Sequence, residues 1–111
     1  MNESSPAEQY QNEILRPILK AQNELILGVF GHYLQKRKVN FEKMNADARL
    51  EFIQNAFRKD QVLRNFFVGL VVGQLLAEQW PAYAALDDEL NRRVVNMLIK
   101  RVQSQLGEAA S

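Results

Sequence analysis

Residues 66–77 read FFVGLVVGQLLA, the most apolar stretch of this 111-residue chain. A surface helix carries one apolar stripe, so a helix that is apolar on nearly every side has to be enclosed by other helices or by another chain. As a helix, the stretch would span about 18 Å, well short of the roughly 30 Å hydrocarbon core of a membrane. It therefore predicts the buried centre of a helical domain and argues against a transmembrane segment.

The composition of the chain narrows the class of protein further. A length of 111 residues suits one domain that folds without a metal or a disulfide. Fourteen Lys and Arg and thirteen Asp and Glu leave a net charge of +1, so the molecule as a whole does not attract nucleic acid or an anionic membrane. The chain has no cysteine, and its polar, acidic N-terminus is unlike a signal peptide, so we expect a cytoplasmic protein.

Apolar residues recur at steps of three and four almost throughout, and no stretch shows a strand pattern. We expect an all-α fold, a single-domain bundle of four principal helices plus a short helix near residues 80–85. The first long helix should end near residues 35–38, and the others are predicted at 46–59, 61–78 and 88–106. The helix at 61–78 should lie at the centre with two apolar faces buried. The domain should span residues 10–107, with flexible segments at 1–9 and 108–111.

Several residues indicate where these helices begin and end. Asn45 and Asp60 stand at N-cap positions, and Gly107 stands where a C′ residue would follow the last helix. Ser5 precedes a proline and resembles the cap of a short leading helix. Pro17 has no backbone N–H, so it should kink the first long helix or restart it there.

Four of the five glycines, Gly28, Gly31, Gly69 and Gly73, lie inside predicted helices. A glycine in a helix interior costs about 1 kcal/mol relative to alanine, so something should offset the loss. We predict a close helix contact, because glycines one turn apart let a neighbouring backbone or ring approach. The contact is either between the two glycine-bearing helices of one chain or between two subunits of a homodimer.

The residue types that carry enzyme chemistry are sparse in this chain. His32 is the only histidine, so one chain offers no pair of histidines for a metal site. The serines lie near the two ends, far from any turn that resembles a nucleophile elbow, and the helical glycines form no phosphate loop. We therefore predict no catalytic residue, no metal and no cofactor, and a protein that is not an enzyme.

Short basic clusters leave a second kind of partner open. If folding brings several of them together, they form a patch that faces phosphates. Solvated helix ends account for the same clusters, so nucleic acid is the alternative partner rather than the first. The clusters are Lys36 to Lys38, Arg58 with Lys59, Arg92 with Arg93, and Lys100 with Arg101.

The triplet Gln-Asn-Glu occurs twice, at residues 11–13 and 22–24. Eleven residues are close to three helical turns, so in an unbroken helix both triplets would lie on nearly the same face. Such a face suits a buried or interfacial polar network, and ordinary exposure of the same side chains explains it equally well. The members that we predict for the network are Asn23, Arg64, Asn65 and Asn91.

Four segments, YQNEILRP (10–17), RLEFIQNA (49–56), KDQVLRN (59–65) and LNRR (90–93), resemble a small bacterial family of uncharacterised all-helical proteins. The resemblance implies a helical fold in a bacterial cytoplasm and no activity. Some members carry a glyoxalase label, which these residues contradict, since metal-dependent glyoxalases are built from βαβββ modules with His and Glu ligands. The chain departs from the family at 67–74, FVGLVVGQ, where a polar, methionine-bearing version is usual.

Two functions remain at this stage. The first is a non-enzymatic protein-interaction or structural module that forms a homodimer, because the chain combines high apolar content with helical glycines, Trp80 and Tyr83. The second is an accessory nucleic-acid-binding protein that uses the local basic clusters. Neither requires a membrane.

Overall fold

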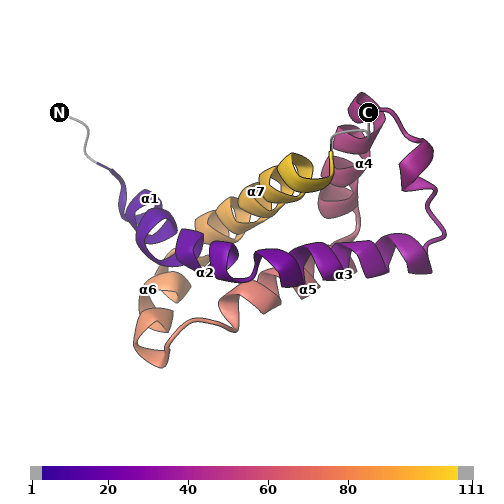
Figure 1. Ribbon diagram of the computed structural model, residues 1–111. Helices are drawn as coiled ribbons and strands as arrows, with labels where there is room; N and C mark the ends of the chain where they lie inside the picture. Colours follow the sequence, from indigo (N-terminus) through magenta and orange to yellow (C-terminus); the bar gives the residue numbers. More distant parts are fainter. Residues whose placement is uncertain (1–3, 108–111) are drawn as a thin grey trace.

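The computed structural model describes residues 4–107, and every regular element in that part of the chain is a helix (Figure 1), which confirms the all-α prediction. The four longest helices pack around one core, with shorter helical segments before and between them. The elements in chain order are α1 (Pro6–Tyr10), the π-helical segment η1 (Gln11–Leu15), α2 (Arg16–Ala21), α3 (Asn23–Lys36), η2 (Phe41–Lys43), α4 (Ala46–Lys59), α5 (Gln61–Val72), η3 (Ala77–Gln79), α6 (Trp80–Ala85) and α7 (Asp87–Leu106).

The first three elements form one helical run that contains a π-helical turn. The Ser5 hydroxyl accepts the Glu8 N–H at 3.1 Å, so the predicted cap is confirmed. Pro17 does not break the run, because it lies in the first turn of α2, where its missing N–H is tolerated. The break comes at Gln22, whose φ of −96° and ψ of 11° separate α2 from α3.

The domain begins earlier than predicted. Part of the segment expected to be flexible, residues 1–9, forms the start of α1, where Ala7 is buried in the core. Tyr10 anchors the same helix, since its ring is buried and its hydroxyl donates to the Gln79 carbonyl at 2.8 Å. The remaining predictions of flexibility, for residues 1–3 and 108–111, lie outside the described residues.

Aromatic rings join three of the long helices. The Phe57 ring of α4 stacks on the Phe30 ring of α3, with centroids 5.7 Å apart and planes 10° apart. On its other side the Phe67 ring of α5 lies 5.1 Å from Phe57. All three residues have no exposed surface, so they form the centre of the core. Helix α7 adds Leu90, Val94, Leu98 and Val102 to the same core.

Helix α5 buries one face rather than two. Leu63, Phe67 and Val71 point into the core, whereas Val62 is 81 % exposed and Phe66 is 58 % exposed. The helix also ends at Val72 instead of continuing to residue 78. The prediction of two buried faces was wrong because the neighbouring helices of this chain cover one side of α5 and leave the other open.

The glycines of the long helices do not mediate a close contact within the chain. A Cβ added at Gly28, Gly31 or Gly69 would meet no atom within 4 Å outside its own helix. Gly73 would meet only the carbonyls of its own helix end, the nearest at 3.0 Å. The predicted contact between the two glycine-bearing helices is therefore absent. The close approach occurs at Gly107, where an added Cβ would lie 2.5 Å from the Leu50 side chain.

Asp60 joins the ends of three helices. Its carboxylate accepts the Leu63 N–H at 3.0 Å, the Tyr33 hydroxyl at 3.2 Å and the Arg37 guanidinium at 2.6 Å. The Leu63 N–H, with the Tyr33 hydroxyl and the Arg37 charge, holds the pKa of Asp60 below its ordinary value of 3.8, against partial burial, which raises it. The Asn45 side chain caps α4 in the same way by accepting the Ala48 N–H at 2.8 Å. Both predicted N-caps are confirmed.

This lowered pKa makes part of the stability dependent on pH. Between the ordinary pKa of 3.8 and the lower pKa of the folded state, the unfolded chain binds a proton at Asp60 that the folded chain does not. We expect the contribution of Asp60 to the free energy of unfolding to be complete above pH 3.8 and to be lost as the pH falls through the pKa of the folded state.

Urea denaturation across a pH series measures this contribution. Asp60→Asn should reduce the loss at acid pH, whereas Asp47→Asn, at an exposed position in the first turn of α4, should leave it unchanged. Equal pH profiles for wild type and Asp60→Asn would contradict the assignment.

Candidate anion-binding groove

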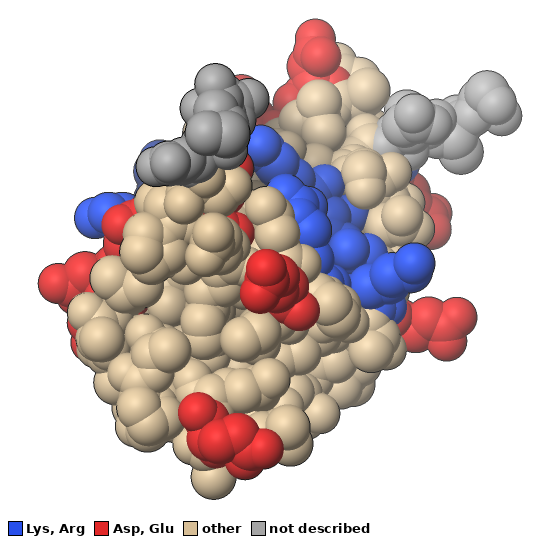
Figure 2. Space-filling view, turned by 90° about the vertical axis from the view of Figure 1, so that its left-hand side faces the viewer, with Lys and Arg blue, Asp and Glu red and all other residues tan. Residues whose placement is uncertain are grey.

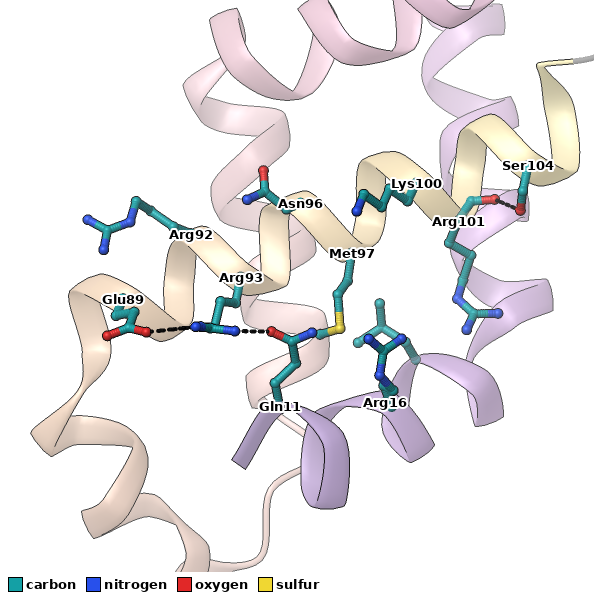
Figure 3. A pocket seen from close by; sticks show the side chains of 11 residues that line it. Gln11, Arg16, Glu89, Arg92, Arg93, Asn96, Met97, Lys100, Arg101 and Ser104 are labelled. Carbon is teal, nitrogen blue, oxygen red and sulfur yellow. Dashed lines mark hydrogen bonds and ion pairs between the residues drawn. The ribbon is translucent and has the colours of Figure 1, made fainter. Parts of the chain in front are cut away.

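A groove of about 720 Å³ runs between α7 and the segment formed by η1 and α2. Five cations and one carboxylate line it, which is a local imbalance in a chain whose net charge is only +1. Figure 2 shows a band of Lys and Arg side chains across one face of the molecule, and Figure 3 shows the groove from close by. We call this feature the basic groove. Its charged residues are Arg16, Glu89, Arg92, Arg93, Lys100 and Arg101.

Arg93 holds the two walls of the basic groove together. Its guanidinium donates to Glu89 at 3.0 Å within α7 and to the Gln11 side-chain oxygen of η1 at 2.8 Å. The ion pair with Glu89 neutralises the one carboxylate of the lining. Arg93 is therefore a structural cation that fixes where η1 lies against α7 (Figure 3).

Arg101 makes the second polar tie between the walls. Its Nη1 donates to the Asn23 side-chain oxygen at 2.9 Å, so the start of α3 is held two turns further along α7. The Nε of Arg101 is buried and has no hydrogen-bond partner in the described part of the chain. Such a donor is costly when nothing accepts from it.

The other three cations are available to a ligand. Neither Arg92 nor Lys100 makes a hydrogen bond or an ion pair with any residue between 4 and 107, and both are exposed. Arg16 is exposed and donates only to the neutral side chain of Asn12, at 2.9 Å. In Figure 3 Arg16 points into the space between α2 and α7. Three positive charges thus line one groove without a negative partner from the described residues.

The repeated Gln-Asn-Glu triplets take part in this arrangement, although not as predicted. Gln11 from the first triplet and Asn23 from the second both contact arginines of α7. A third member, Gln22, donates to the Leu70 carbonyl of α5 at 3.3 Å. The triplets therefore fasten the N-terminal segment to the rest of the domain.

Folding brings three of the four residues predicted to form one polar network to the same cavity, whereas Asn23 lies elsewhere. Asn23 pairs with Arg101 at the basic groove, and Arg64 donates to the Arg58 carbonyl at 2.9 Å. Asn91 accepts the hydroxyl of Tyr83, and Asn65 is exposed. No hydrogen bond links Arg64, Asn65 and Asn91 to one another within residues 4–107, so the predicted hydrogen-bonded network is absent. Arg64, Asn65 and Asn91 instead line a second cavity, on the other side of α7.

Tyr83 is the most shielded polar ring near this second cavity. Burial, with smaller contributions from Tyr10 and the charge of Asp87, raises the pKa of Tyr83 to about 12. The hydroxyl therefore stays protonated at neutral pH and donates to the side-chain oxygen of Asn91. Because the side-chain oxygen of Asn91 accepts this bond, the NH₂ group of the Asn91 amide faces away from Tyr83.

Two further observations bear on the kind of site. No group of three or more His, Asp or Glu side chains capable of holding a metal ion occurs among the described residues, and His32 is exposed on α3. None of the described helices is long and apolar enough to cross a membrane.

The basic clusters at Lys36 to Lys38 and at Arg58 with Lys59 do not line the basic groove, so folding gathers only the clusters of α7 and adds Arg16 to them.

Comparison with known proteins gives no further guide to this site. The chain matches no protein family, no curated protein and no solved structure. The resemblance to a bacterial helical family stays a prediction, and the function has to be inferred from the residues of the groove itself.

Proposed function

We propose that this protein is a non-enzymatic binding module whose basic groove holds the phosphate backbone of a nucleic acid. The observation that carries the proposal is the grouping of Arg16, Arg92 and Lys100, three exposed cations with no acidic partner from the described residues. Cations gathered along one groove raise its positive potential, which attracts a polyanion, and binding then releases the counterions of the polyanion.

The length of the basic groove favours a polymer over a small anion. Its lining on α7 extends from Glu89 to Ser104, which corresponds to about 22 Å at 1.5 Å per residue. Arg92 and Lys100 alone are about 12 Å apart along the helix axis, a span of three to four phosphates at roughly 3.4 Å per phosphate of one DNA strand.

The lining also favours phosphates over an acidic peptide. Four of its five cations are arginines, whose planar guanidinium pairs with phosphate and carboxylate oxygens alike, so the rest of the lining decides between the two. A peptide helix that lies in a groove needs apolar anchor sites. Leu19 lines the groove but is only 1 % exposed, and the partly buried Met97 is the other apolar residue of the lining, so the groove offers a peptide at most one apolar anchor site.

A binding titration at two salt concentrations tests the proposal. With about four phosphate contacts, affinity for a labelled 16-base-pair duplex should fall roughly 100-fold between about 50 and 200 mM salt. Polyglutamate of equal charge should compete poorly. Absence of binding at low salt by both the duplex and a single strand of it would end the proposal, and equal competition by polyglutamate would assign the groove to an acidic protein instead.

Self-association is a second candidate, favoured by the open face of α5. Val62 and Phe66 are largely exposed there, and Gly73 lies on the same side of the helix with no other element near it. The proposed assembly is a homodimer in which this apolar face is covered by a second copy. Light scattering at tens of micromolar measures the mass, and Phe66→Asp should return a dimer to a monomer. A wild-type monomer would remove this candidate.

A further inference from the structure

The second cavity has a volume of about 660 Å³ and lies across α7 from the basic groove. We call it the Trp80 pocket. Arg92 and Asn96 line both the pocket and the groove, so the two sites adjoin at these residues. Figure 3 shows both side chains pointing away from Gln11 and Arg16, toward the far side of α7. A ligand in the basic groove that crosses Arg92 therefore enters the Trp80 pocket.

One wall of the Trp80 pocket is a braced aromatic ring. The Trp80 ring stacks on the Tyr83 ring, with centroids 5.8 Å apart and planes 15° apart. Tyr83 is buried and is itself held by its bond to Asn91. Trp80 is still 49 % exposed, so one face of the indole is supported while the rest faces the pocket and solvent. This is the arrangement of a stacking platform for a planar ligand.

Amide groups supply hydrogen-bond donors to the same pocket. The side-chain oxygen of Asn91 is occupied by the Tyr83 hydroxyl, and that of Asn96 accepts from Arg58 at 3.1 Å. Both amides are thereby oriented with their NH₂ groups still available. Asn65 makes no hydrogen bond with residues 4–107, so its donor and acceptor are both available. Planar heterocycles with ring nitrogens and carbonyl oxygens present the acceptors that these donors require.

The floor of the Trp80 pocket contains one of the three helical glycines that no contact within the chain explains. Gly69 lines the pocket, and a Cβ added there would meet no atom within 4 Å. The apolar side chains beside it come from Val68 and Val72 on α5 and from Val95 on α7. A glycine at this position leaves room over the floor that any larger residue would reduce.

From these features we propose that the Trp80 pocket takes an unstacked nucleobase of a single strand whose phosphates lie in the basic groove. The base stacks on Trp80, its ring nitrogens and carbonyl oxygens accept from Asn91 and Asn96, and Arg92 binds the phosphate between the two sites. This inference rests on the proposed function and adds to it that the partner is single-stranded. A duplex keeps its bases paired and stacked, so it reaches the basic groove alone.

The experiment uses the full chain and compares a labelled single-stranded 12-mer of mixed sequence with the corresponding duplex at one salt concentration. The single strand should bind at least about tenfold more tightly, because base stacking on an aromatic side chain is worth about that factor. Trp80 is the only tryptophan, so its fluorescence reports the stacking directly. We expect quenching by the single strand and none by the duplex or by a 12-mer that lacks bases.

Two variants separate the pocket from the groove. Trp80→Ala and Gly69→Leu should each lower single-strand affinity about tenfold and leave duplex affinity unchanged. Gly28→Leu is the matched control, since Gly28 also lies in a helix with no atom within 4 Å of an added Cβ but does not line the pocket. Thermal melting checks that each variant folds, and Trp80→Phe should retain most of the single-strand affinity.

The outcomes distinguish this inference from the proposed function. Salt-dependent binding of both nucleic acids with equal affinity, without quenching and without an effect of Trp80→Ala, would overturn the base pocket and leave the basic groove in place. No binding of either nucleic acid at low salt would overturn both.

Discussion

Reversing two charges in the basic groove should abolish duplex binding without changing the fold. In the variant Arg16→Glu with Lys100→Glu, two exposed cations from opposite walls become anions. Each lost phosphate contact lowers the salt slope by about one unit, so the slope should fall by about two, and affinity at about 50 mM salt should drop roughly 100-fold or more. Fluorescence anisotropy with the labelled duplex measures both quantities.

The matched control changes the total charge by the same amount elsewhere. Lys36 and Lys38 are exposed near the C-terminal end of α3 and do not line the basic groove. Lys36→Glu with Lys38→Glu should therefore keep most of the affinity. Equal losses in the two variants would show that only the overall charge of the molecule matters and would contradict a defined groove.

The largest expected loss of stability follows from Phe57→Ala. Phe57 has no exposed surface and lies between the Phe30 and Phe67 rings, so its removal leaves a cavity where α3, α4 and α5 meet. We expect a loss of about 3–5 kcal/mol in the free energy of unfolding, which is a large part of the 5–15 kcal/mol typical of a domain. The midpoint and slope of urea denaturation measure the change.

Phe66→Ala is the control for this result. Phe66 is the next aromatic residue on α5, but it is 58 % exposed, so the same truncation should cost about 1 kcal/mol or less. A loss below about 1 kcal/mol for Phe57→Ala, or equal losses for the two variants, would contradict the core as described.

Features set by short-range chemistry could be predicted from the sequence. The caps at Ser5, Asn45 and Asp60 depend on side chains and N–H groups three residues apart, and all three are present. The length of α5 could not be predicted in the same way. The run contains two glycines, Gly69 and Gly73, and its sequence does not show which of them ends the helix; the helix passes through Gly69 and ends at Val72, with Gly73 as its C-cap.

Features set by packing between distant segments were missed or wrongly placed. A glycine in a helix permits a close approach, but only the tertiary structure shows whether a neighbour is there. Gly69 has no such neighbour, whereas Gly107 comes against Leu50, far away in sequence. The basic groove was missed as a unit because Arg16 and Arg92 are separated by most of the chain. The repeated triplets were the available signal, since Gln11 and Asn23 hold the segment that carries Arg16 against α7.

The tie between Gln11 and Arg93 joins residues 82 positions apart, and this separation determines when the groove comes into existence. One wall leaves the ribosome early in synthesis, and the opposite wall is among the last parts of the domain to emerge. Before α7 is made, the N-terminal segment carries one of the groove's cations, and no second wall is present to combine with it. If the basic groove binds nucleic acid as proposed, we expect a nascent chain to have little affinity for the RNA that surrounds it and to gain that affinity only when the domain is complete and folded.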